Sequence, residues 1–259
     1  MKENVLAKKK NGMAALMGIL LLFAVSVAGI VFGAIAIERH SSSPMLAAGI
    51  VMLVAGIVMV VVSLILLCGL KVLKPQEALV LTLFGRYVGT LKEDGFYFVN
   101  PFCTSFNPAA KTKLSQSGDV SAASMLAAAN GSTTVEAGSN KISLKIMTLN
   151  NNKQKINDCL GNPVEIGIAV TWRVVDTAKA VFNVDNYKEF LSLQCDSALR
   201  DIVRIYPYDV APNVDTTGDG IADEGSLRGS SEIVAGKIRD EIQRRVAEAG
   251  IEIVEARIT

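Results

Sequence analysis

Two long uncharged segments near the N-terminus constrain this chain more than any other feature of its sequence. No Asp, Glu, Lys or Arg interrupts residues 11–37, and none interrupts residues 41–70. A helix rises about 1.5 Å per residue, so about 20 apolar residues cross the ~30 Å hydrocarbon core of a bilayer. We therefore expect transmembrane helices over residues 13–37 and 45–70. The first run is too long for the apolar region of a cleaved signal peptide, which holds about 7 to 15 residues.

A short polar loop, residues 38–44, joins the two spans and determines how they run. It is too short to cross the membrane, so the helices must form an antiparallel hairpin with both flanks on one side. Because basic residues favour the cytoplasmic side, we expect the flanks and the region after residue 70 to face the cytoplasm. The basic residues that support this orientation are Lys2, Lys8, Lys9 and Lys10 in the N-terminal tail, residues 1–12, and Lys71 and Lys74 after the hairpin, against Arg39 alone in the loop.

Glycines within the spans allow helix backbones to approach closely. Gly29 and Gly33 form a GxxxG pattern, and Gly49 and Gly56 lie one heptad apart. Packing within the hairpin is the favoured interpretation, and an interface between subunits is the alternative. The spans hold no charged residue, so nothing in them marks an ion path.

Composition removes several classes of function. The net charge is +1 at pH 7, so the chain lacks the basic surface that binding nucleic acid requires. His40 is the only histidine, which excludes histidine metal clusters and catalytic triads with a histidine base. The four cysteines have no CxxC spacing and are expected to be free thiols in a reducing compartment. We therefore expect no catalytic residue, no cofactor and no bound metal.

The region after the hairpin, residues 75–259, mixes patterns typical of strands and of helices. We expect the first two predicted strands to pair as a β-hairpin, and Ser231 to cap the last helix. Strands are predicted over residues 78–84, 95–99, 141–149, 164–175 and 251–258, and helices over residues 187–205 and 232–249.

Four aromatic residues gather close to the predicted membrane spans. They are Phe96, Tyr97, Phe98 and Phe102. Aromatic side chains are enriched where a protein meets the membrane interface, so these residues are candidates for contact with lipid. Packing in the domain core is the favoured alternative.

Two segments read as loops. Residues 109–140 are dominated by Ser, Ala, Gly, Thr and Asn without a sustained period, which indicates a flexible insertion. Residues 215–226 partly match a calcium loop but lack an acid at its third position, and Ser226 stands where a bidentate Glu is expected. A solvated acidic turn is the favoured interpretation of this second segment.

In its sequence motifs and in the order of its elements, the chain resembles the SPFH or band 7 superfamily, which includes stomatins, prohibitins, flotillins and bacterial relatives. The resemblance covers residues 75–259 apart from the insertion. It rests on these stretches: QEALVLTLFGR at 76–86, DGFYFVNPF at 94–102, DCLGNPVEIGIAVTWRVVDTAKAVF at 158–182, ALRD at 198–201, YPYD at 206–209 and RRVAEAGIEIVEARI at 244–258.

The resemblance implies an α+β SPFH domain, an antiparallel or mixed sheet with packed helices. It does not extend to the two spans, which depart from the single N-terminal segment or intramembrane loop common in the family but occur in some bacterial relatives. We therefore expect a bacterial-type member anchored in the cytoplasmic membrane. The resemblance also implies a non-enzymatic scaffold that forms a homo-oligomeric ring or dome around a patch of membrane lipid and its partner proteins. The alternatives are a regulatory subunit of one membrane protease or channel and, more distantly, a membrane-bound enzyme. Family members usually continue into a coiled coil, which does not appear here, so either the chain is partial or the SPFH region itself drives assembly.

Overall fold

The structure, a computed structural model, describes residues 3–6, 11–39, 43–112, 139–209, 226–228 and 230–259. The chain forms two compact units. We call Val5–Ser105 the hairpin unit, and Phe106–Thr259 together with Met1–Asn4 the sheet unit. The division falls inside the predicted domain of residues 75–259, because the first strands of that domain group with the apolar helices.

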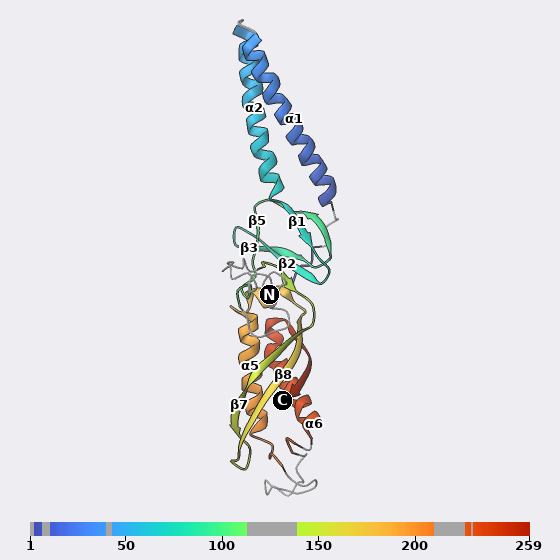
Figure 1. The fold of residues 1–259 in the computed structure, drawn as a ribbon, viewed down its shortest axis with the longest axis vertical. Helices are drawn as coiled ribbons and strands as arrows, with labels where there is room; N and C mark the ends of the chain where they lie inside the picture. Colours follow the sequence, from blue (N-terminus) through green and yellow to red (C-terminus); the bar gives the residue numbers. More distant parts are fainter. Residues whose placement is uncertain (1–2, 7–10, 40–42, 113–138, 210–225, 229) are drawn as a thin grey trace, which may run out of the picture. The chain divides into compact units, whose positions relative to one another are not determined.

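Two long helices, α1 (Gly12–Arg39) and α2 (Ser43–Leu67), form the hairpin and lie side by side (Figure 1). They confirm the two predicted helices. The second helix ends earlier than predicted, because the chain turns at Cys68 and Gly69 and enters a strand at Leu70.

Five strands complete the hairpin unit. A two-stranded ribbon pairs β1 (Leu70–Leu73) with β4 (Gly95–Phe98). A second sheet places β2 (Glu77–Leu83) between β3 (Arg86–Leu91) and β5 (Cys103–Ser105). All of these pairings are antiparallel.

The predicted pairing of residues 78–84 with residues 95–99 is wrong. Phe84 and Gly85 form a two-residue turn with φ values of 49° and 82°, which sends the chain straight back into β3. The sequence did not predict strand β3, because Gly89 and Thr90 interrupt its apolar pattern. The ribbon strand β4 pairs instead with β1, for which the sequence predicts no strand.

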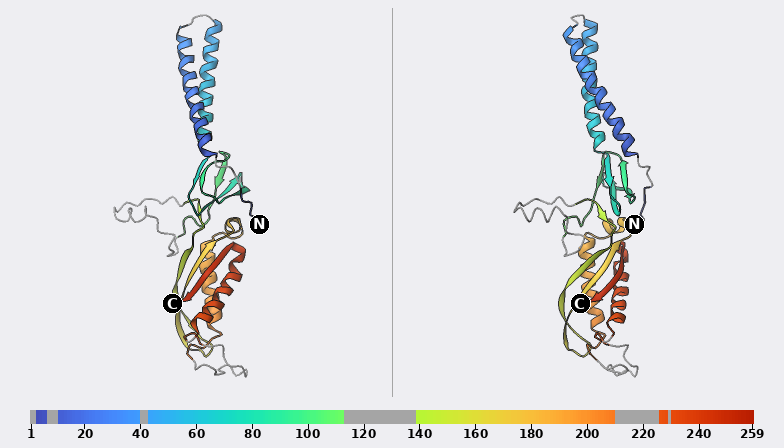
Figure 2. Two further views of the ribbon diagram at one scale, coloured as in Figure 1. Left: turned by 90° about the vertical axis from the view of Figure 1, so that its right-hand side faces the viewer. Right: turned by 45° about the vertical axis from the view of Figure 1, so that its right-hand side comes forward.

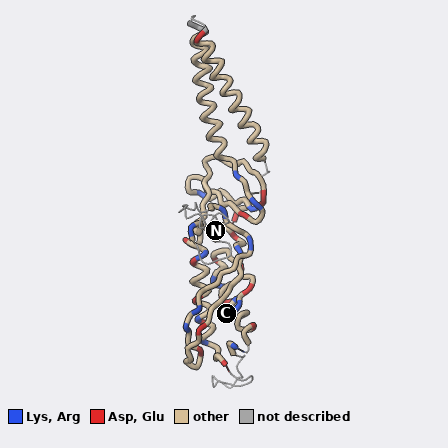
Figure 3. The backbone as a smooth tube through the Cα atoms, in the orientation of Figure 1, with Lys and Arg blue, Asp and Glu red and all other residues tan. Residues whose placement is uncertain are grey.

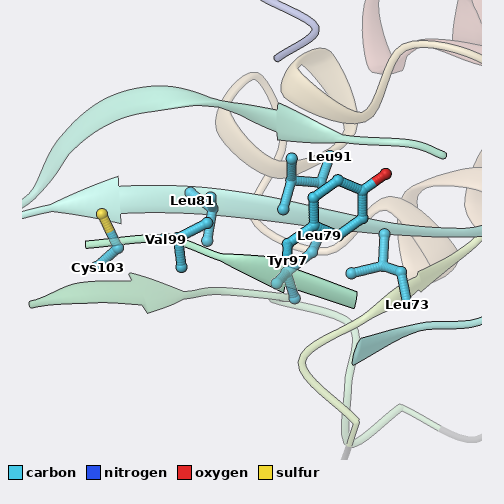
Figure 4. Close-up of a cluster of buried hydrophobic side chains, with 7 residues drawn as sticks. All are labelled: Leu73, Leu79, Leu81, Leu91, Tyr97, Val99 and Cys103. Carbon is cyan, nitrogen blue, oxygen red and sulfur yellow. The ribbon is translucent and has the colours of Figure 1, made fainter. Parts of the chain in front are cut away.

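The strands of the hairpin unit enclose a small apolar core. The side chains in it come from β1 to β5 and the segments beside them, and each is at most 8% exposed. They are Leu73, Leu79, Leu81, Leu91, Tyr97, Val99 and Cys103 (Figure 4). Burying one such leucine contributes about 1.5–3 kcal/mol, so this cluster is what holds the short strands together.

The N-terminal segment that precedes α1 joins this sheet. Val5 makes a parallel bridge to Thr90, and the Leu6 N–H donates to the Thr90 carbonyl at 2.9 Å. Leu6 also packs against the apolar core. The outer edge of β3 is thereby covered by residues that precede α1 in the chain. Lys2 and Lys8 to Lys10 of the predicted basic tail lie outside the described residues.

The sheet unit is built on an antiparallel sheet in the order β7-β8-β9. Its strands are β7 (Met147–Asn157), β8 (Pro163–Val174) and β9 (Ile251–Ile258), and a short strand β6 (Ile142–Ser143) precedes them. β9 has its predicted bounds, and each end of β8 lies within one residue of the position predicted for it.

The predicted strand over residues 141–149 is broken in two. The Ser143 hydroxyl accepts a hydrogen bond from the Lys145 N–H at 3.3 Å, which turns the chain after β6. Ile146 is 58% exposed, and the buried face resumes out of phase at Met147. Beyond Leu149, mostly polar residues continue β7 as far as Asn157, without apolar alternation that could predict a strand there.

Helices cover one face of this sheet, as both views of Figure 2 show for α5 and α6. The helices are α4 (Thr177–Phe182), α5 (Tyr187–Val203) and α6 (Ser231–Val246), followed by a 3-10 turn at Ala247–Ala249. The predicted cap of α6 is off by one residue, because Ser230 holds the cap position and makes no side-chain cap hydrogen bond. The predicted stop at Gly250 is confirmed by its left-handed φ of 66°.

The start of the predicted insertion belongs to the packed structure. Ala109 is 1% exposed. Thr112 accepts hydrogen bonds from Asn186 Nδ2 at 2.7 Å and, through its carbonyl, from Lys188 Nζ at 3.1 Å. Asn107 Nδ2 donates to the carbonyls of Ser139 and Lys141, so the two ends of the segment lie close together. Residues 113–138 lie outside the described residues.

Candidate membrane interface

The outer surfaces of α1 and α2 are apolar and uncovered. In the most apolar stretch of each helix only 17% and 11% of the residues are buried, so these are not the core helices of a soluble domain. Leu21 is 68% exposed and Val51 is 67% exposed. Figure 3 shows both helices without blue or red along their length except near the loop. The charged residues of α1 are Glu38 and Arg39 at its end. Each exposed Leu, Ile or Val favours insertion by about 0.3–0.6 kcal/mol, so the helices are candidate membrane spans.

Glycines bring the two helix backbones into direct contact. A Cβ atom on Gly33 would lie 2.9 Å from the Leu53 nitrogen, and one on Gly56 would lie 3.0 Å from the Ser26 carbonyl oxygen. Gly49 meets the Gly33 carbonyl in the same way at 3.2 Å. These three glycines therefore pack within the hairpin. Gly29 has nothing within 4 Å of its Cβ position, so the GxxxG pair is not used as a unit there.

The two serines inside the spans are satisfied within their own helices. Ser26 Oγ donates to the Phe23 carbonyl, and Ser63 Oγ donates to the Val60 carbonyl, each at 2.7 Å. Local bonds of this kind let a hydroxyl sit in an apolar helix without a further partner.

The β1–β4 ribbon lies directly against the ends of both helices. Gly69 follows α2, and its carbonyl accepts a hydrogen bond from the Val99 N–H at 2.9 Å. At the start of α1, a Cβ atom on Gly12 would lie 2.6 Å from the Phe96 ring. The ribbon therefore lies at the end of the hairpin where α1 begins and α2 ends.

The two faces of the ribbon differ. One face carries Leu73 and Tyr97, which are buried in the core, with Lys71 opposite Tyr97. The other carries Leu70, Val72, Phe96 and Phe98, of which none is buried and Val72 is 58% exposed. The second face continues the uncovered apolar surface of the helices.

Of the four aromatic residues singled out from the sequence, one packs in the core and three are partly or largely exposed. Tyr97 is 2% exposed and its hydroxyl donates to the Glu93 carbonyl at 3.2 Å, so it is a core residue. Phe96 and Phe98 are half-buried beside the helix ends. Phe102 is 59% exposed and stacks on Phe84, with ring centroids 6.4 Å apart. Contact of these rings with lipid stays a prediction.

Sequence reasoning missed Phe84, which is the most exposed of these aromatic side chains at 87%. It lies in the turn between β2 and β3 and was assigned to the end of a strand. The signal that could have found it is the Phe-Gly pair itself, because a glycine at the second position of a two-residue turn ends a strand one residue earlier.

One buried carboxylate organises the loop between β7 and β8. Asp158 is 5% exposed and accepts hydrogen bonds from the N–H groups of Leu160, Asn162 and Tyr208 and from the Asn162 side chain, at 2.7–3.1 Å. Burial raises the pKa of Asp158, but the hydrogen bonds from Asn162, Tyr208 and Leu160 outweigh it and lower the pKa below its ordinary value. This arrangement is structural, because the carboxylate holds the turn between β7 and β8 and ties it to Tyr208 after α5.

A second cluster of charge ties α6 to α5. Arg245 binds Glu241 at 2.6 Å, Asp201 at 2.7 Å and the Ser197 hydroxyl at 2.8 Å. Arg244 also contacts Glu241. Hydrogen bonds from Arg244 and then Arg245 lower the pKa of Glu241.

Within the described ranges, no group of three or more His, Cys, Asp or Glu side chains is placed to hold a metal. The partial calcium pattern at residues 215–225 lies outside those ranges, while Ser226 is buried. All four cysteines are free thiols, and burial raises the pKa of Cys195 to about 12.

Comparison with protein families identifies the region after α2. The family model described as the SPFH domain / Band 7 family matches residues 71–259. The match begins at Lys71 in β1, two residues beyond the Gly69 carbonyl that holds the ribbon, and it runs to Thr259. No curated protein matches the chain.

Proposed function

The chain belongs to the SPFH domain / Band 7 family, and from that membership we propose that it is a non-enzymatic scaffold of a membrane. Membership supports a membrane-associated, scaffold-type role in general, and members of the family are generally non-enzymatic. The observation that carries the proposal is that the family domain starts immediately after α2, so that two uncovered apolar helices are joined to it without a linker.

The scaffold we propose is an assembly of identical subunits in one membrane. The helices and the apolar face of the ribbon hold each subunit at the same depth, so that neighbouring domains meet in a plane. Subunits arranged in this way would close into a ring or dome around a patch of lipid and gather partner proteins there. The basic flanks described above support a cytoplasmic position for the domain.

Two measurements test this function. Washing membranes with alkaline carbonate should leave the full-length protein in the membrane, because the helices hold it by their apolar surface rather than by charge. Electron microscopy of the protein extracted in mild detergent should show large homo-oligomers. Release by carbonate would contradict the membrane attachment, and a uniform monomer in mild detergent would contradict the scaffold.

A regulatory subunit dedicated to one membrane protease or channel is the alternative. Crosslinking in native membranes separates the two functions. A scaffold should recover its own subunits and a mixture of partners, whereas a dedicated regulator should recover one partner in fixed stoichiometry. An enzymatic role would be revived by an activity that a single Asp or Ser substitution abolishes without loss of assembly.

A further inference from the structure

Two exposed phenylalanines stack on each other in the hairpin unit, although they come from different segments. Phe84 lies in the turn between β2 and β3, and Phe102 lies between β4 and β5. Their ring planes are inclined by 25°, and the two side chains are 87% and 59% exposed. Neither ring belongs to the apolar core of the hairpin unit.

The backbone at Phe84 shows that the turn itself does not call for a phenylalanine. Phe84 has a φ of 49° and Gly85 a φ of 82°, both in the left-handed region. Two-residue turns with this geometry favour Asn-Gly, Asp-Gly or Gly-Gly, since other side chains are strained there. A large apolar ring at the first position therefore costs conformational free energy and, in water, leaves apolar surface exposed.

The pair lies at the end of the hairpin unit where the helices emerge. Phe102 follows Val99 by three residues, so its Cα atom lies within about 10 Å of the Val99 Cα. Val99 is itself hydrogen bonded to Gly69, just beyond α2. Phe84 follows Leu83, which pairs with Cys103 beside Phe102. Figure 4 shows Val99 and Cys103 at one end of the apolar core and Leu73 at the other.

The acidic residues beside these strands lie at the end remote from α2. Asp94 precedes Gly95, which pairs with Leu73 at the end of β1 remote from α2. Glu77 lies at that remote end too, since its carboxylate accepts the Lys74 N–H at 3.2 Å just after β1. At the Phe84 end the exposed charged neighbour is Arg86. Aromatic rings with a nearby cation, and acids kept away, are typical of segments that rest in the membrane interface.

We propose that Phe84 and Phe102 form an aromatic anchor that inserts at the boundary between the lipid headgroups and the acyl chains, beside the exit of α2. The occupant of this surface is the bilayer that holds α1 and α2, because the pair lies at the Val99 and Cys103 end of the strands, and Val99 is hydrogen bonded to Gly69 where α2 ends. The inference rests on the membrane attachment proposed above and adds a contact that the helices alone do not provide. The anchor sets the depth and the tilt of the strands at the membrane surface.

Quenching by brominated lipids tests the anchor. The full chain carrying Phe84→Trp is reconstituted in phosphatidylcholine bilayers whose acyl chains are brominated near the carbonyl end. The native Trp172 is fully buried in the sheet unit, and the wild-type protein supplies its background signal. We expect the added emission to be blue-shifted and to fall by about half or more in brominated bilayers. Glu93→Trp, in the exposed turn before β4, is the matched control and should keep its emission.

Three results would overturn the proposal. Emission from Phe84→Trp that bromine leaves unchanged would show a ring in water, or, if blue-shifted, a ring covered by protein. Equal quenching of Glu93→Trp would show that the ring pair has no special position. Phe102→Trp provides the same test if Phe84→Trp does not fold. Carbonate extraction and detergent oligomers of the same preparations report on the proposed function separately, so the two ideas can fail independently.

Discussion

Gly33 of α1 lies against the backbone of Leu53 in α2, with 2.9 Å between the position of a Cβ atom on the glycine and the leucine nitrogen. Gly33→Ala should therefore push the helices apart and lower the free energy of unfolding of the hairpin by about 1–3 kcal/mol. Titration of the purified protein with a denaturing detergent in mixed micelles, followed by circular dichroism, measures the change.

Gly29→Ala is the matched control for this substitution. It adds the same methyl group on the same helix where nothing lies within 4 Å, so its effect should stay within about 1 kcal/mol and favour the helix. Equal losses for the two variants would show that α1 does not pack on α2 through Gly33.

Acid should weaken the sheet unit through Asp158. The folded-state pKa lies below the ordinary value of 3.8, so the carboxylate stabilises the fold fully above pH 4 and loses this contribution as the pH falls through the folded pKa. Asp158→Asn should cost about 2–3 kcal/mol at pH 7, since the charged acceptor of four hydrogen bonds is lost. Trp172 fluorescence during urea unfolding reports on this unit.

The difference between Asp158→Asn and the wild type should narrow at acid pH, because the wild-type carboxyl is then protonated too. Asp209→Asn is the control, since the Asp209–Arg228 ion pair is mostly exposed and contributes about 0–1 kcal/mol. A difference that stays constant from pH 7 to below pH 4 would contradict the role of the ionised carboxylate.

Arg245 should contribute more to stability than other arginines on α6. Its side chain is 25% exposed and bridges Glu241 to Asp201 on α5, whereas the Arg239–Asp240 pair is exposed and local. Arg245→Met should lower the free energy of unfolding by about 1–3 kcal/mol, and Arg239→Met by less than about 0.5 kcal/mol. Denaturant titration of both variants measures the two free energies of unfolding. Equal losses of stability would show that the ion pairs between α5 and α6 add nothing beyond an exposed pair.

Thiol labelling should discriminate among the cysteines by burial. Cys195 is fully buried and its pKa is raised to about 12, so the folded protein should resist maleimide there at pH 8 and accept it in denaturant. Cys103 is also buried, which makes both residues poor reporters of membrane sidedness. Mass spectrometry of labelled peptides measures each site, and rapid labelling of Cys195 in the folded state would contradict the packing of α5.

An introduced cysteine at an exposed position reports the orientation of the domain. Leu193 on α5 is 66% exposed, so Leu193→Cys should label readily once the reagent reaches it. We expect labelling only after cells are permeabilised, because basic flanks favour the cytoplasmic orientation proposed above. Labelling of intact cells would reverse the proposed orientation.

The sequence was sufficient for elements whose pattern is long and uniform. Length and lack of charge predicted α1 and α2, and β9 was predicted to the residue. The pairing of β2 could not be predicted in the same way, because β3 contains Gly89 and the fully buried Thr90 and so lacks apolar alternation. The second half of β7 is a run of Asn, Lys and Gln, which carries no strand signal.

The candidate interface was predictable in composition and not in orientation. Alternation assigns Phe96 and Phe98 to one face and Tyr97 to the other, but both faces of β4 carry aromatic rings, so the sequence does not tell which one is the core. The exposure of Phe84 was not predicted, because phenylalanine favours strands, whereas here the residue lies in a two-residue turn.

The bridge from Val5 to Thr90 bears on how the protein is made. Val5 is synthesised before the first span and Thr90 after the second, so the bridge can close only when both residues have been left on the same side of the membrane. A chain inserted with one span, or with its N-terminus translocated, would leave the edge of β3 bare and the small core incomplete. Such a chain would expose an unpaired strand edge, which is a template for pairing with other chains.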